Sequence, residues 1–511
     1  MSLKLYNSFS KKEEEFTPLK SGEVSMYTCG PTVYGRPHIG NYSSFLMADL
    51  LRRWLEVSGY KVTHVKNITD VGHLANDADE GEDKIEKQAK AEKIDPLAIA
   101  RKYTAQYLAD EKLLNVIEPE FRPLATGTVK EMITIIQELL KSGHAYETED
   151  GIYFDVQTFP AYGKLSGNTL EHLNAGARIE VDEKKKHPAD FALWKKTVGS
   201  NAHHILRWHF ATGERSDSLG DDAQSGFPGW HIECSAMSRK HLGLTLDIHT
   251  GGEDNIFPHH ECEIAQSECS GSHPFARYWL HKRRIEVIAS EEASESQEGV
   301  KMSKSLGNVL SIDDVLGRGF SPMDLRYVLL SVHYRTRLKF NWKGMDDGKK
   351  ARRKIMEWMT EMETHIANAG SKADVPVQKS SFIYADQFRA AMDADLNTSA
   401  ALAAIFEAIA WTRNQTSLSS DELGAIRAFM KIIRATFGCF EPEEQASIPA
   451  DVQKLFDDRQ QARAHKNFAL SDSLRKEIES RGFMVEDSAK GTRKCGGLWS
   501  ATSSWSHRTK C

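Results

Sequence analysis

The sequence predicts an α/β protein in which a parallel-sheet domain is interrupted by an insertion and followed by an all-α C-terminal half. A strand–helix–strand pattern occupies residues 24–68, and a second α/β stretch runs from about 229 to 319. Beyond residue 346 the pattern is almost wholly helical. A chain of 511 residues exceeds the size at which one hydrophobic core stops growing, so two to four domains are expected.

The first element is a βαβ unit. Residues 24–28 and 60–68 have the β-branched, apolar character of strands, whereas apolar residues between 41 and 58 recur at helical spacing. Such a crossover favours a parallel sheet whose ligand site lies at the carboxyl ends of the strands.

The remaining elements follow in order along the chain. Amphipathic helices are expected at about 83–114 and 128–142, and the irregular, glycine-broken stretch 145–225 is interpreted as an insertion. In the helical half, the apolar residues that share one face are Leu402, Ile405, Phe406 and Ile409. Residues 370–380 are expected to form a linker and 495–511 a frayed, disordered tail.

Composition and charge narrow the class of protein. With 40% apolar and 27% charged residues the chain is globular, and its net charge of -6 means that RNA contact must use local basic surface. The N-terminus lacks the apolar core of a secretory signal, and no run is long enough to span a bilayer, so a cytoplasmic protein without a membrane partner is expected. Seven sparse cysteines indicate reduced thiols rather than a disulfide framework.

A phosphate-binding turn is predicted between the first strand and the first helix, at Pro37-His38-Ile39-Gly40-Asn41. Free backbone N–H groups and the helix dipole favour an anion there. His38 and Asn41 can donate to phosphate, and Gly40 permits close approach. Taken alone, the segment is better explained by a turn with an asparagine helix cap, and that simpler interpretation is preferred for an isolated match.

A lysine-containing loop, Lys301-Met302-Ser303-Lys304-Ser305, carries the second signal. Two lysines on a mobile polar loop can follow negative charge as it moves onto a leaving pyrophosphate. The alternative is a solvated basic loop. That alternative loses most of its weight because both motifs occur in order around the βαβ core.

The two segments together resemble the signatures of class I aminoacyl-tRNA synthetases, with Asn41 in place of the commoner histidine. The resemblance implies a Rossmann-like catalytic domain that uses ATP, with Mg²⁺, as a substrate. It implies that His38, Gly40 and Asn41 contact the ATP phosphates. It also implies that Lys304, assisted by Lys301, stabilises the transition state of adenylation.

Three further segments resemble the zinc-binding segments of cysteine–tRNA ligases: Tyr27 to Thr32, Gly229 to Met237 and Phe257 to Glu263. The resemblance implies L-cysteine as the amino acid and one Zn²⁺ per chain, held by Cys29, Cys234, His259 and Glu263. Two thiolates and an imidazole suit zinc, with a carboxylate as the more labile fourth ligand. From spacing alone, two ordinary buried cysteines beside a surface helix would be preferred.

Position and charge add detail to this metal hypothesis. His259 and Glu263 lie four residues apart just after Pro258, so both can face one ion, while His260 and Cys262 are expected to point elsewhere. Because two thiolates already neutralise the metal, Glu263 is expected to loosen or leave when a substrate thiolate arrives. Zinc would favour cysteine over serine, whose hydroxyl is a poor ligand.

Other segments of the chain resemble the same family. They imply that Gly251, Gly252 and Asp254 lie near the adenosine, and that Thr32 and Trp230 lie near the cysteine. Trp230 could equally be a core aromatic. The implied domains are a catalytic domain (1–120 and 226–320), an inserted connective domain (121–225), a connecting segment (321–345), a helical bundle (346–442) and an anticodon-binding domain (448–494).

RNA contact is expected in the C-terminal half. The basic residues that open its first helix are Lys349, Lys350, Arg352, Arg353 and Lys354, and a solvated helix face explains them equally well. Residues 392–398 and 468–493 resemble the helical and anticodon-reading domains of the family. The implied partners are the tRNA for cysteine, L-cysteine and ATP, bound by a monomer.

Two polar stretches are interpreted as structural. His203, His204 and His209 are assigned to a structured insertion, because no acidic or thiol partner shares their spacing. The acidic run 76–83 is assigned to a solvated loop, with loose Mg²⁺ binding as the alternative.

Two rival functions remain open. One is a ligase with the same core that joins activated cysteine to an amino sugar, although such relatives lack the helical extension seen here at 346–494. The other is a catalytically silent RNA-binding or cysteine-sensing protein, against which His38, Lys301 and Lys304 argue.

Overall fold

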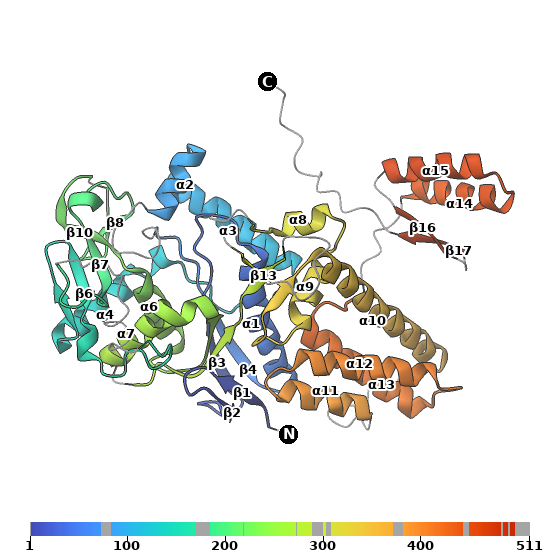
Figure 1. Cartoon of the computed structure of the whole chain (residues 1–511), viewed down its shortest axis with the longest axis horizontal. Helices are drawn as coiled ribbons and strands as arrows, with labels where there is room; N and C mark the ends of the chain where they lie inside the picture. Colours follow the sequence, from blue (N-terminus) through green and yellow to red (C-terminus); the bar gives the residue numbers. More distant parts are fainter. Residues whose placement is uncertain are drawn as a thin grey trace. The chain divides into compact units, whose positions relative to one another are not determined.

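The computed structural model describes residues 2–72, 83–168, 184–217, 219–271, 273–288, 300–302, 308–370, 382–442, 449–481, 484–488 and 491–495 (Figure 1). Two compact units divide the chain, Met1–Phe440 and Glu441–Cys511. The predicted linker at 370–380 lies outside the described residues except for Gly370. The predicted tail also lies outside them except for Cys495, which ends a strand.

A four-stranded parallel sheet forms the centre of the first unit, in the order β12-β11-β3-β4. Its strands are β3 (Glu23–Thr28), β4 (Lys61–Lys66), β11 (Leu246–Gly252) and β12 (Ala276–Lys282). Helix α1 (Ile39–Val57) makes the crossover from β3 to β4, as the sequence predicts. Since β3 leads to β4 on one side and pairs with β11 on the other, the point between β3 and β11 is where a ligand site is expected.

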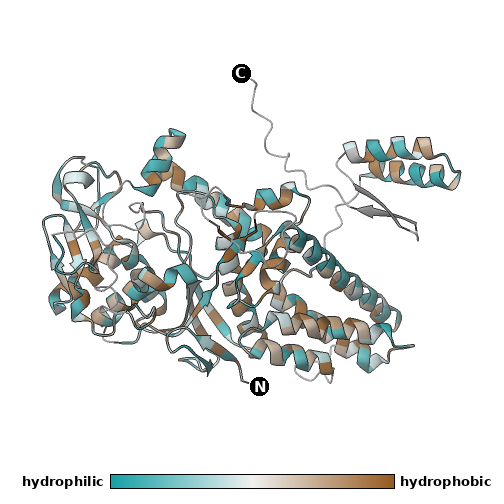
Figure 2. Ribbon diagram, viewed as in Figure 1, coloured by the Kyte–Doolittle hydropathy of each residue, from teal (hydrophilic) through white to brown (hydrophobic). Residues whose placement is uncertain are grey.

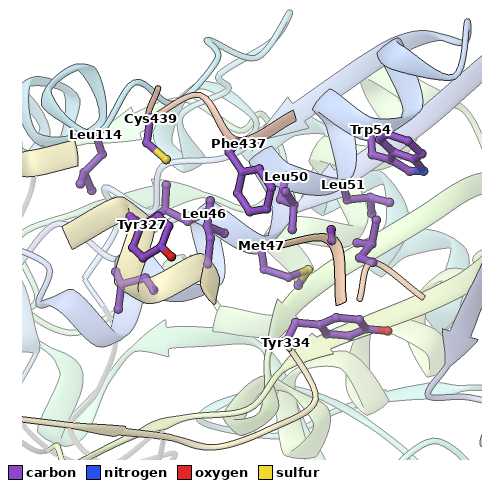
Figure 3. Packing of buried hydrophobic residues seen from close by; sticks show 14 of the residues in the cluster. Leu46, Met47, Leu50, Leu51, Trp54, Leu114, Tyr327, Tyr334, Phe437 and Cys439 are labelled. Atoms are coloured by element: carbon purple, nitrogen blue, oxygen red, sulfur yellow. The ribbon is translucent and has the colours of Figure 1, made fainter. Parts of the chain in front are cut away.

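Helix α1 carries the main core of this unit. Its buried face includes Leu46, Leu50 and Trp54, which recur at helical spacing. The helix packs against α9 and α13 as well as the sheet. In Figure 3 Leu46 lies near Tyr327 of α9 and Leu50 near Phe437 of α13, so one core joins the sheet to the helical half.

The predicted helical stretch 83–114 consists of two helices. Helix α2 (Lys84–Glu92) is followed by Lys93 as its left-handed C-cap, and α3 (Pro96–Leu113) begins with a proline at its first position. Asp95 accepts a hydrogen bond from Ala98 N and caps α3, so the break follows from Asp-Pro chemistry. The next helix, α4 (Val129–Ser142), matches its prediction.

The insertion is an antiparallel six-stranded sheet in the order β5-β6-β7-β10-β8-β9, rather than an irregular segment. Its strands are β5 (Ala145–Glu147), β6 (Gly151–Phe154), β7 (Phe191–Thr197), β8 (Arg207–His209), β9 (Arg215–Ser216) and β10 (Asp222–Pro228). The strands are short, and register shifts interrupt the pairing of β7 with both β6 and β10. Such strands give no sustained alternation in the sequence, which is why periodicity missed them.

The remaining elements of the first unit are mainly helical. The helices are α6 (Trp230–Leu242), α7 (Glu261–Gly271), α8 (Ile312–Gly317), α9 (Pro322–Ser331), α10 (Trp342–Asn368), α11 (Ile383–Asp393), α12 (Thr398–Arg413) and α13 (Ser420–Phe437). The short helices are η2 (Ala125–Gly127), η3 (Val156–Thr158), η4 (Gly199–Asn201), η5 (Glu253–Asn255) and η6 (Ile256–His260). The small strands are β1 (Lys4–Asn7), β2 (Lys12–Glu15), β13 (Ile285–Val287), β14 (Val300–Lys301) and β15 (Leu338–Phe340).

The helical half has the amphipathic character that its sequence predicts. Polar and apolar residues alternate around α10 to α13 in Figure 2, and Leu402, Ile405 and Ile409 of α12 are buried. Phe406 is only partly buried. Among the described helices, none has both the length and the apolar content that crossing a membrane requires.

The second unit is small. Helices α14 (Ala450–Ala464) and α15 (Phe468–Ser480) pack around a core of Val452, Phe456 and Ile478. A hairpin follows, in which β16 (Met484–Ser488) pairs antiparallel with β17 (Gly491–Cys495).

A buried ion network fastens α1 to α9 and α13. Asp49 of α1 accepts hydrogen bonds from Arg53 Nε at 2.7 Å, from Ile117 N at 2.7 Å and from Arg326 of α9. Burial raises the pKa of Asp49, but the two guanidinium groups outweigh it and hold the pKa at about 2. A Cβ at Gly438, after α13, would lie 2.8 Å from Arg53 Cζ, so glycine is needed for this close approach.

We expect Asp49→Asn to lower the free energy of unfolding of the first unit by about 3 kcal/mol, because the buried Arg326 and the partly buried Arg53 lose their counter-charge. Since the folded pKa is depressed, the contribution is complete above about pH 4 and is lost as the pH falls toward 2. Urea unfolding followed by tryptophan fluorescence measures both effects. The control Glu23→Gln breaks an exposed pair with Lys20 and should leave the free energy of unfolding almost unchanged; equal losses in the two variants would contradict the assignment.

Candidate active site and metal centre

The candidate site lies where β3 and β11 end side by side. Cys29 directly follows β3, and its N–H donates to Thr250 O of β11 at 3.3 Å. Gly30 N donates to Asn67 Oδ1 at 2.7 Å, and a Cβ at Gly30 would lie 1.6 Å from Asn67 O. The chain can turn here only because residue 30 is glycine, and this turn positions the Cys29 thiol at the strand ends.

Four buried side chains from separate elements meet at this point, and we refer to them as the Cys–Cys–His–Glu group: Cys29, Cys234 of α6, His259 of η6 and Glu263 of α7. The two Sγ atoms lie 3.9 Å apart, and Cys234 Sγ lies 3.5 Å from His259 Nε2. Glu263 Oε1 lies 2.8 Å from His259 Nε2 and 3.7 Å from Cys29 Sγ. The structure therefore brings together the four residues named from the sequence, in an arrangement that could hold a metal ion.

The expectation that His260 points away from this group is wrong. His260 Nε2 lies 3.3 Å from Cys29 Sγ. Residues 256–260 form a π-type turn that is wider than an α-helix, and Phe257 within it has extended backbone angles, so neighbouring histidines reach the same pocket. Cys262 does point elsewhere, with its Sγ 3.5 Å from the Tyr162 hydroxyl.

Sequence reasoning missed two histidines that complete the pocket. His249 of β11 lies with Nε2 2.8 Å from Glu263 Oε2, and His281 of β12 lies with Nε2 2.7 Å from His260 Nδ1. Cys29, His249, His260 and Glu263 form a second set that could hold a metal. The signal that could have identified His281 is the register of β11 against β12, because His281 pairs with Gly251, two residues beyond His249.

The pKa values of the side chains in this site are strongly shifted. Burial, together with the negative charge of Cys234 and Glu263, raises the pKa of Cys29 well above its ordinary value. Burial also raises the pKa of Glu263, but the charges of His249 and His259 outweigh it and hold this pKa well below the usual range. Burial lowers the pKa of His259, whereas Glu263 and Cys234 raise it more, to about 10. Converging acidic donors of this kind favour a bound cation.

Trp230 lies against the Cys–Cys–His–Glu group. It is the first residue of α6, and its ring stacks on His259 with centroids 4.2 Å apart. Thr32 is partly buried and forms an isolated parallel bridge with Thr69, whose hydroxyl donates to Glu233 at 2.6 Å. Both residues predicted to contact the amino acid thus lie on segments that flank the Cys–Cys–His–Glu group.

The predicted nucleotide turn caps α1. His38 is the N-cap, its Nδ1 accepts from Asn41 N at 3.2 Å, and Asn41 Oδ1 accepts from His38 N at 3.0 Å. The structure therefore contains a helix cap at this turn, with His38 rather than Asn41 as the N-cap and Asn41 completing the capping box. A Cβ at Gly40 would lie 2.8 Å from the His38 ring, which leaves room only for glycine.

Both flanks of the lysine loop reach this turn. Met302 Sδ lies 3.9 Å from the Cβ position of Gly40, and Ile39 N donates to Leu310 O at 2.9 Å. The backbone of Lys301 pairs with Glu286 of β13. Lys304 lies outside the described residues.

The predicted adenosine contacts lie at the end of β11. A Cβ at Gly251 would lie 2.6 Å from the His260 ring, and one at Gly252 would lie 3.3 Å from Ser44 Oγ of α1. The glycine pair therefore lies between His260 and the second turn of α1. Asp254 follows in η5 and is exposed.

The interpretation of the insertion histidines needs correction. His204 Nε2 lies 2.9 Å from Asp83 Oδ2, and its Nδ1 lies 3.8 Å from Glu86 Oε1, so His204 does have acidic partners. These partners come from α2, 121 residues away in the case of Asp83. Asp83 is buried and caps α2, so it is not part of a solvated loop, whereas residues 76–82 lie outside the described part of the chain.

One residue of the basic patch is also buried. Arg352 donates to Cys439 O at 2.7 Å and to Asp324 at 3.1 Å, so it joins α10 to the core rather than facing solvent. Lys349, Lys350 and Arg353 are more exposed and pair with groups of their own surroundings.

Comparison with known proteins places the chain in a family. A model described as "tRNA synthetases class I (C) catalytic domain" matches residues 15–350, a "DALR domain" matches 387–441, and a "Cysteinyl-tRNA ligase anticodon binding domain" matches 445–493.

Similar proteins extend over almost the whole chain. A cysteine–tRNA ligase of Chlorobium chlorochromatii is 39% identical and covers 98% of this chain and 99% of the relative. One of Thermus thermophilus is also 39% identical, over 96% and 99%.

Solved structures share the fold at low identity. A LeuRS–tRNA–LeuAMS complex from Agrobacterium radiobacter has a TM-score of 0.61 at 10% identity, covering 83% of this chain and 85% of that one. Mycobacterium tuberculosis methionyl-tRNA synthetase has a TM-score of 0.54 at 14% identity, covering 82% and 92%. The breadth of the family-model matches and the near-complete coverage by relatives show that this chain belongs to the cysteine–tRNA ligase family of class I aminoacyl-tRNA synthetases.

Proposed function

We propose that this chain activates L-cysteine with ATP, forming cysteinyl-adenylate and pyrophosphate, and then transfers cysteine to the 3′ end of its tRNA. The observation that carries the proposal is the Cys–Cys–His–Glu group, which lies at the strand ends beside the capped start of α1. A thiol-selective metal pocket next to a nucleotide turn is what cysteine activation requires.

The donor set fits Zn²⁺. Ligand atoms of a tetrahedral zinc lie about 3.3–3.9 Å from one another, because Zn–S is about 2.3 Å and Zn–N or Zn–O about 2.0–2.2 Å. The separations Cys29–Cys234, Cys234–His259 and Cys29–Glu263 fall in that range at 3.9, 3.5 and 3.7 Å. His259 Nε2 and Glu263 Oε1 lie closer together, at 2.8 Å, and would have to move apart to share one ion. When bound, zinc would lower the pKa of the substrate thiol and ligate its sulfur, which the serine hydroxyl does poorly.

Contacts around the four side chains support their role. His231 Nδ1 lies 3.0 Å from His259 Nδ1, so a second residue orients the imidazole, as is common for metal-binding histidines. Glu263 also has a second partner, since its Oε2 lies 2.8 Å from His249. A carboxylate that leaves the group can thus keep a hydrogen bond to His249, which supports Glu263 as the ligand that yields to substrate.

ATP is assigned to the turn that caps α1. Because His38 accepts a hydrogen bond through Nδ1, its neutral ring carries the proton on Nε2, the nitrogen suited to donate to a phosphate oxygen. We infer that Gly40 and Asn41 line the phosphates, that Gly251, Gly252 and Asp254 line the adenosine, and that Thr32 and Trp230 hold the cysteine. Lys301 and Lys304 would stabilise charge on the pyrophosphate, with Mg²⁺ as counter-ion.

The acceptor is inferred to be tRNA. None of the Cys–Cys–His–Glu residues comes from helices α10 to α13 or from the unit beyond Phe440, and these parts offer additional surface to an RNA acceptor. The match of residues 445–493 to an anticodon-binding domain supports the same acceptor over an amino sugar.

We expect Cys234→Ser to lose bound zinc and cysteine selectivity together, because the metal loses one of its two thiolates. Zinc content per chain and ATP–pyrophosphate exchange with cysteine and with serine measure the two effects. Cys269→Ser is the matched control: this thiol on α7 lies outside the group and should keep one zinc per chain. A Cys234→Ser protein that retains zinc or still rejects serine would contradict the proposal.

We expect His38→Asn to lower kcat for exchange about 100-fold while leaving the melting temperature unchanged. Asparagine is a good N-cap, so the substitution keeps the cap of α1 and removes only the ring donor. Ser419→Asn at the N-cap of α13 is the control and should change neither quantity. Unchanged exchange in His38→Asn would remove His38 from the phosphate site.

We expect activated cysteine to be consumed only when tRNA is supplied. Release of AMP in the presence of ATP and cysteine should rise with added tRNA and stay at background with a glucosamine-containing acceptor. Cysteine-dependent AMP release that requires the amino sugar would favour the rival ligase. A preparation with no cysteine-dependent exchange would favour a silent relative.

A further inference from the structure

A small cavity lies inside the first unit, and none of its lining residues belongs to the candidate site. It is lined by Ser43, Met47, Leu50, Lys282, Leu329, Leu330, Val332, Tyr334 and Thr398. Figure 3 shows Met47 and Leu50 on α1 with Tyr334 nearby. The cavity has room for about one water molecule or one monoatomic ion.

Three polar atoms of this lining have no hydrogen-bond partner in the structure: Ser43 Oγ, Lys282 Nζ and Thr398 Oγ1. Their residues are only 1%, 2% and 2% exposed. An unpaired buried polar group costs about 1–3 kcal/mol, and a charged one costs more. That all three line one cavity indicates a shared ligand rather than three separate defects.

The charge of Lys282 is not compensated by a neighbouring carboxylate within the described residues. Glu253 is the carboxylate whose negative charge raises the pKa of Lys282. Glu253 already forms ion pairs with Arg283 at 2.7 Å and with Arg284 at 3.4 Å. Burial lowers the pKa of Lys282 to about 8, with Glu253 opposing the shift, so the ammonium remains mostly protonated at pH 7. A protonated ammonium in a mainly apolar cavity calls for an anion.

Other charged groups near the cavity are occupied. The Tyr334 hydroxyl donates to Asp395 at 2.5 Å, and Asp395 also accepts from Tyr6 N at 2.8 Å and pairs with Arg335 at 2.7 Å. Both hydrogen bonds use Oδ1, whereas Oδ2 forms the ion pair with Arg335 and has no hydrogen-bond partner. The charge of Asp395 is thus paired with Arg335.

We propose that this cavity binds a chloride ion between Lys282 Nζ and the hydroxyl groups of Ser43 and Thr398. All three groups can donate, and chloride accepts such bonds while supplying the missing negative charge. A water molecule would satisfy the hydroxyls but leave the ammonium uncompensated.

The site would join two parts of the first unit. Ser43 and Lys282 belong to α1 and β12 of the sheet region, whereas Thr398 begins α12 of the helical half. Because the ion would be held by donors from both, its binding would stabilise the packing between them. The ligand stabilises the folded chain by mass action, so stability should depend on the halide concentration.

The first test compares melting temperatures of the full chain in sodium chloride and in sodium gluconate at equal ionic strength. The wild type should melt about 2 °C higher in chloride. Lys282→Met keeps the approximate length of the side chain and removes its charge. The difference in melting temperature between the two salts should therefore vanish in this variant. Lys20→Met is the control: Lys20 is exposed, and this variant should keep the wild-type difference. An equal response to chloride in wild type and Lys282→Met would overturn the proposal.

The second test locates the ion directly. Crystals grown in sodium bromide should show an anomalous peak beside Lys282 Nζ in the wild type. Thr398→Val, which removes one hydroxyl and keeps the charge, should reduce both this peak and the chloride-dependent rise in melting temperature. A cavity without anomalous signal at bromide concentrations that replace chloride would exclude the halide and assign the space to water.

Discussion

Parallel pairing between β3 and β11 is the constraint on which the site depends. It places Cys29 beside Thr250, and the glycine pair Gly251-Gly252 continues β11 from that point. The close approach of Gly30 to Asn67 then turns the chain so that the thiol stays at the strand ends. Helices α6 and α7 bring Cys234 and Glu263 to the same place, so the sheet sets the position and the helices complete the donor set.

Electrostatics holds the pocket together once the backbone has positioned it. Glu263 lies between His249 and His259, with one carboxylate oxygen 2.8 Å from each. Such an arrangement in a dry interior is stable only when every charge has a partner. The Cys29 thiol, whose pKa burial and two acidic neighbours raise, is the group that gains most from a bound cation. The protonation states of these side chains and metal binding are thus linked, because both involve the same atoms.

The sequence predicts the regular part of the fold well and the long-range part less well. The βαβ unit and the C-terminal helices follow from periodicity, and the observed β4 is only slightly shorter than predicted. The six-stranded insertion gave no such signal because its strands are short and its registers shift. In the site, the Cys–Cys–His–Glu residues were found from local segments. The contacts of His260 and His281 depend on a π-type turn and on strand register, and His204 meets Asp83 across 121 residues.

The donors of the metal group are widely separated along the chain. Cys29 and Glu263 lie 234 residues apart, and Cys234 and His259 fall near the end of that interval. At about 5–20 residues per second, a ribosome needs roughly 12–47 s to make the intervening segment. For that time the first cysteine emerges without the other three side chains, so it is exposed to oxidation and to premature capture of metal. The order of translation, and not only the finished fold, therefore decides when this pocket can acquire its ion.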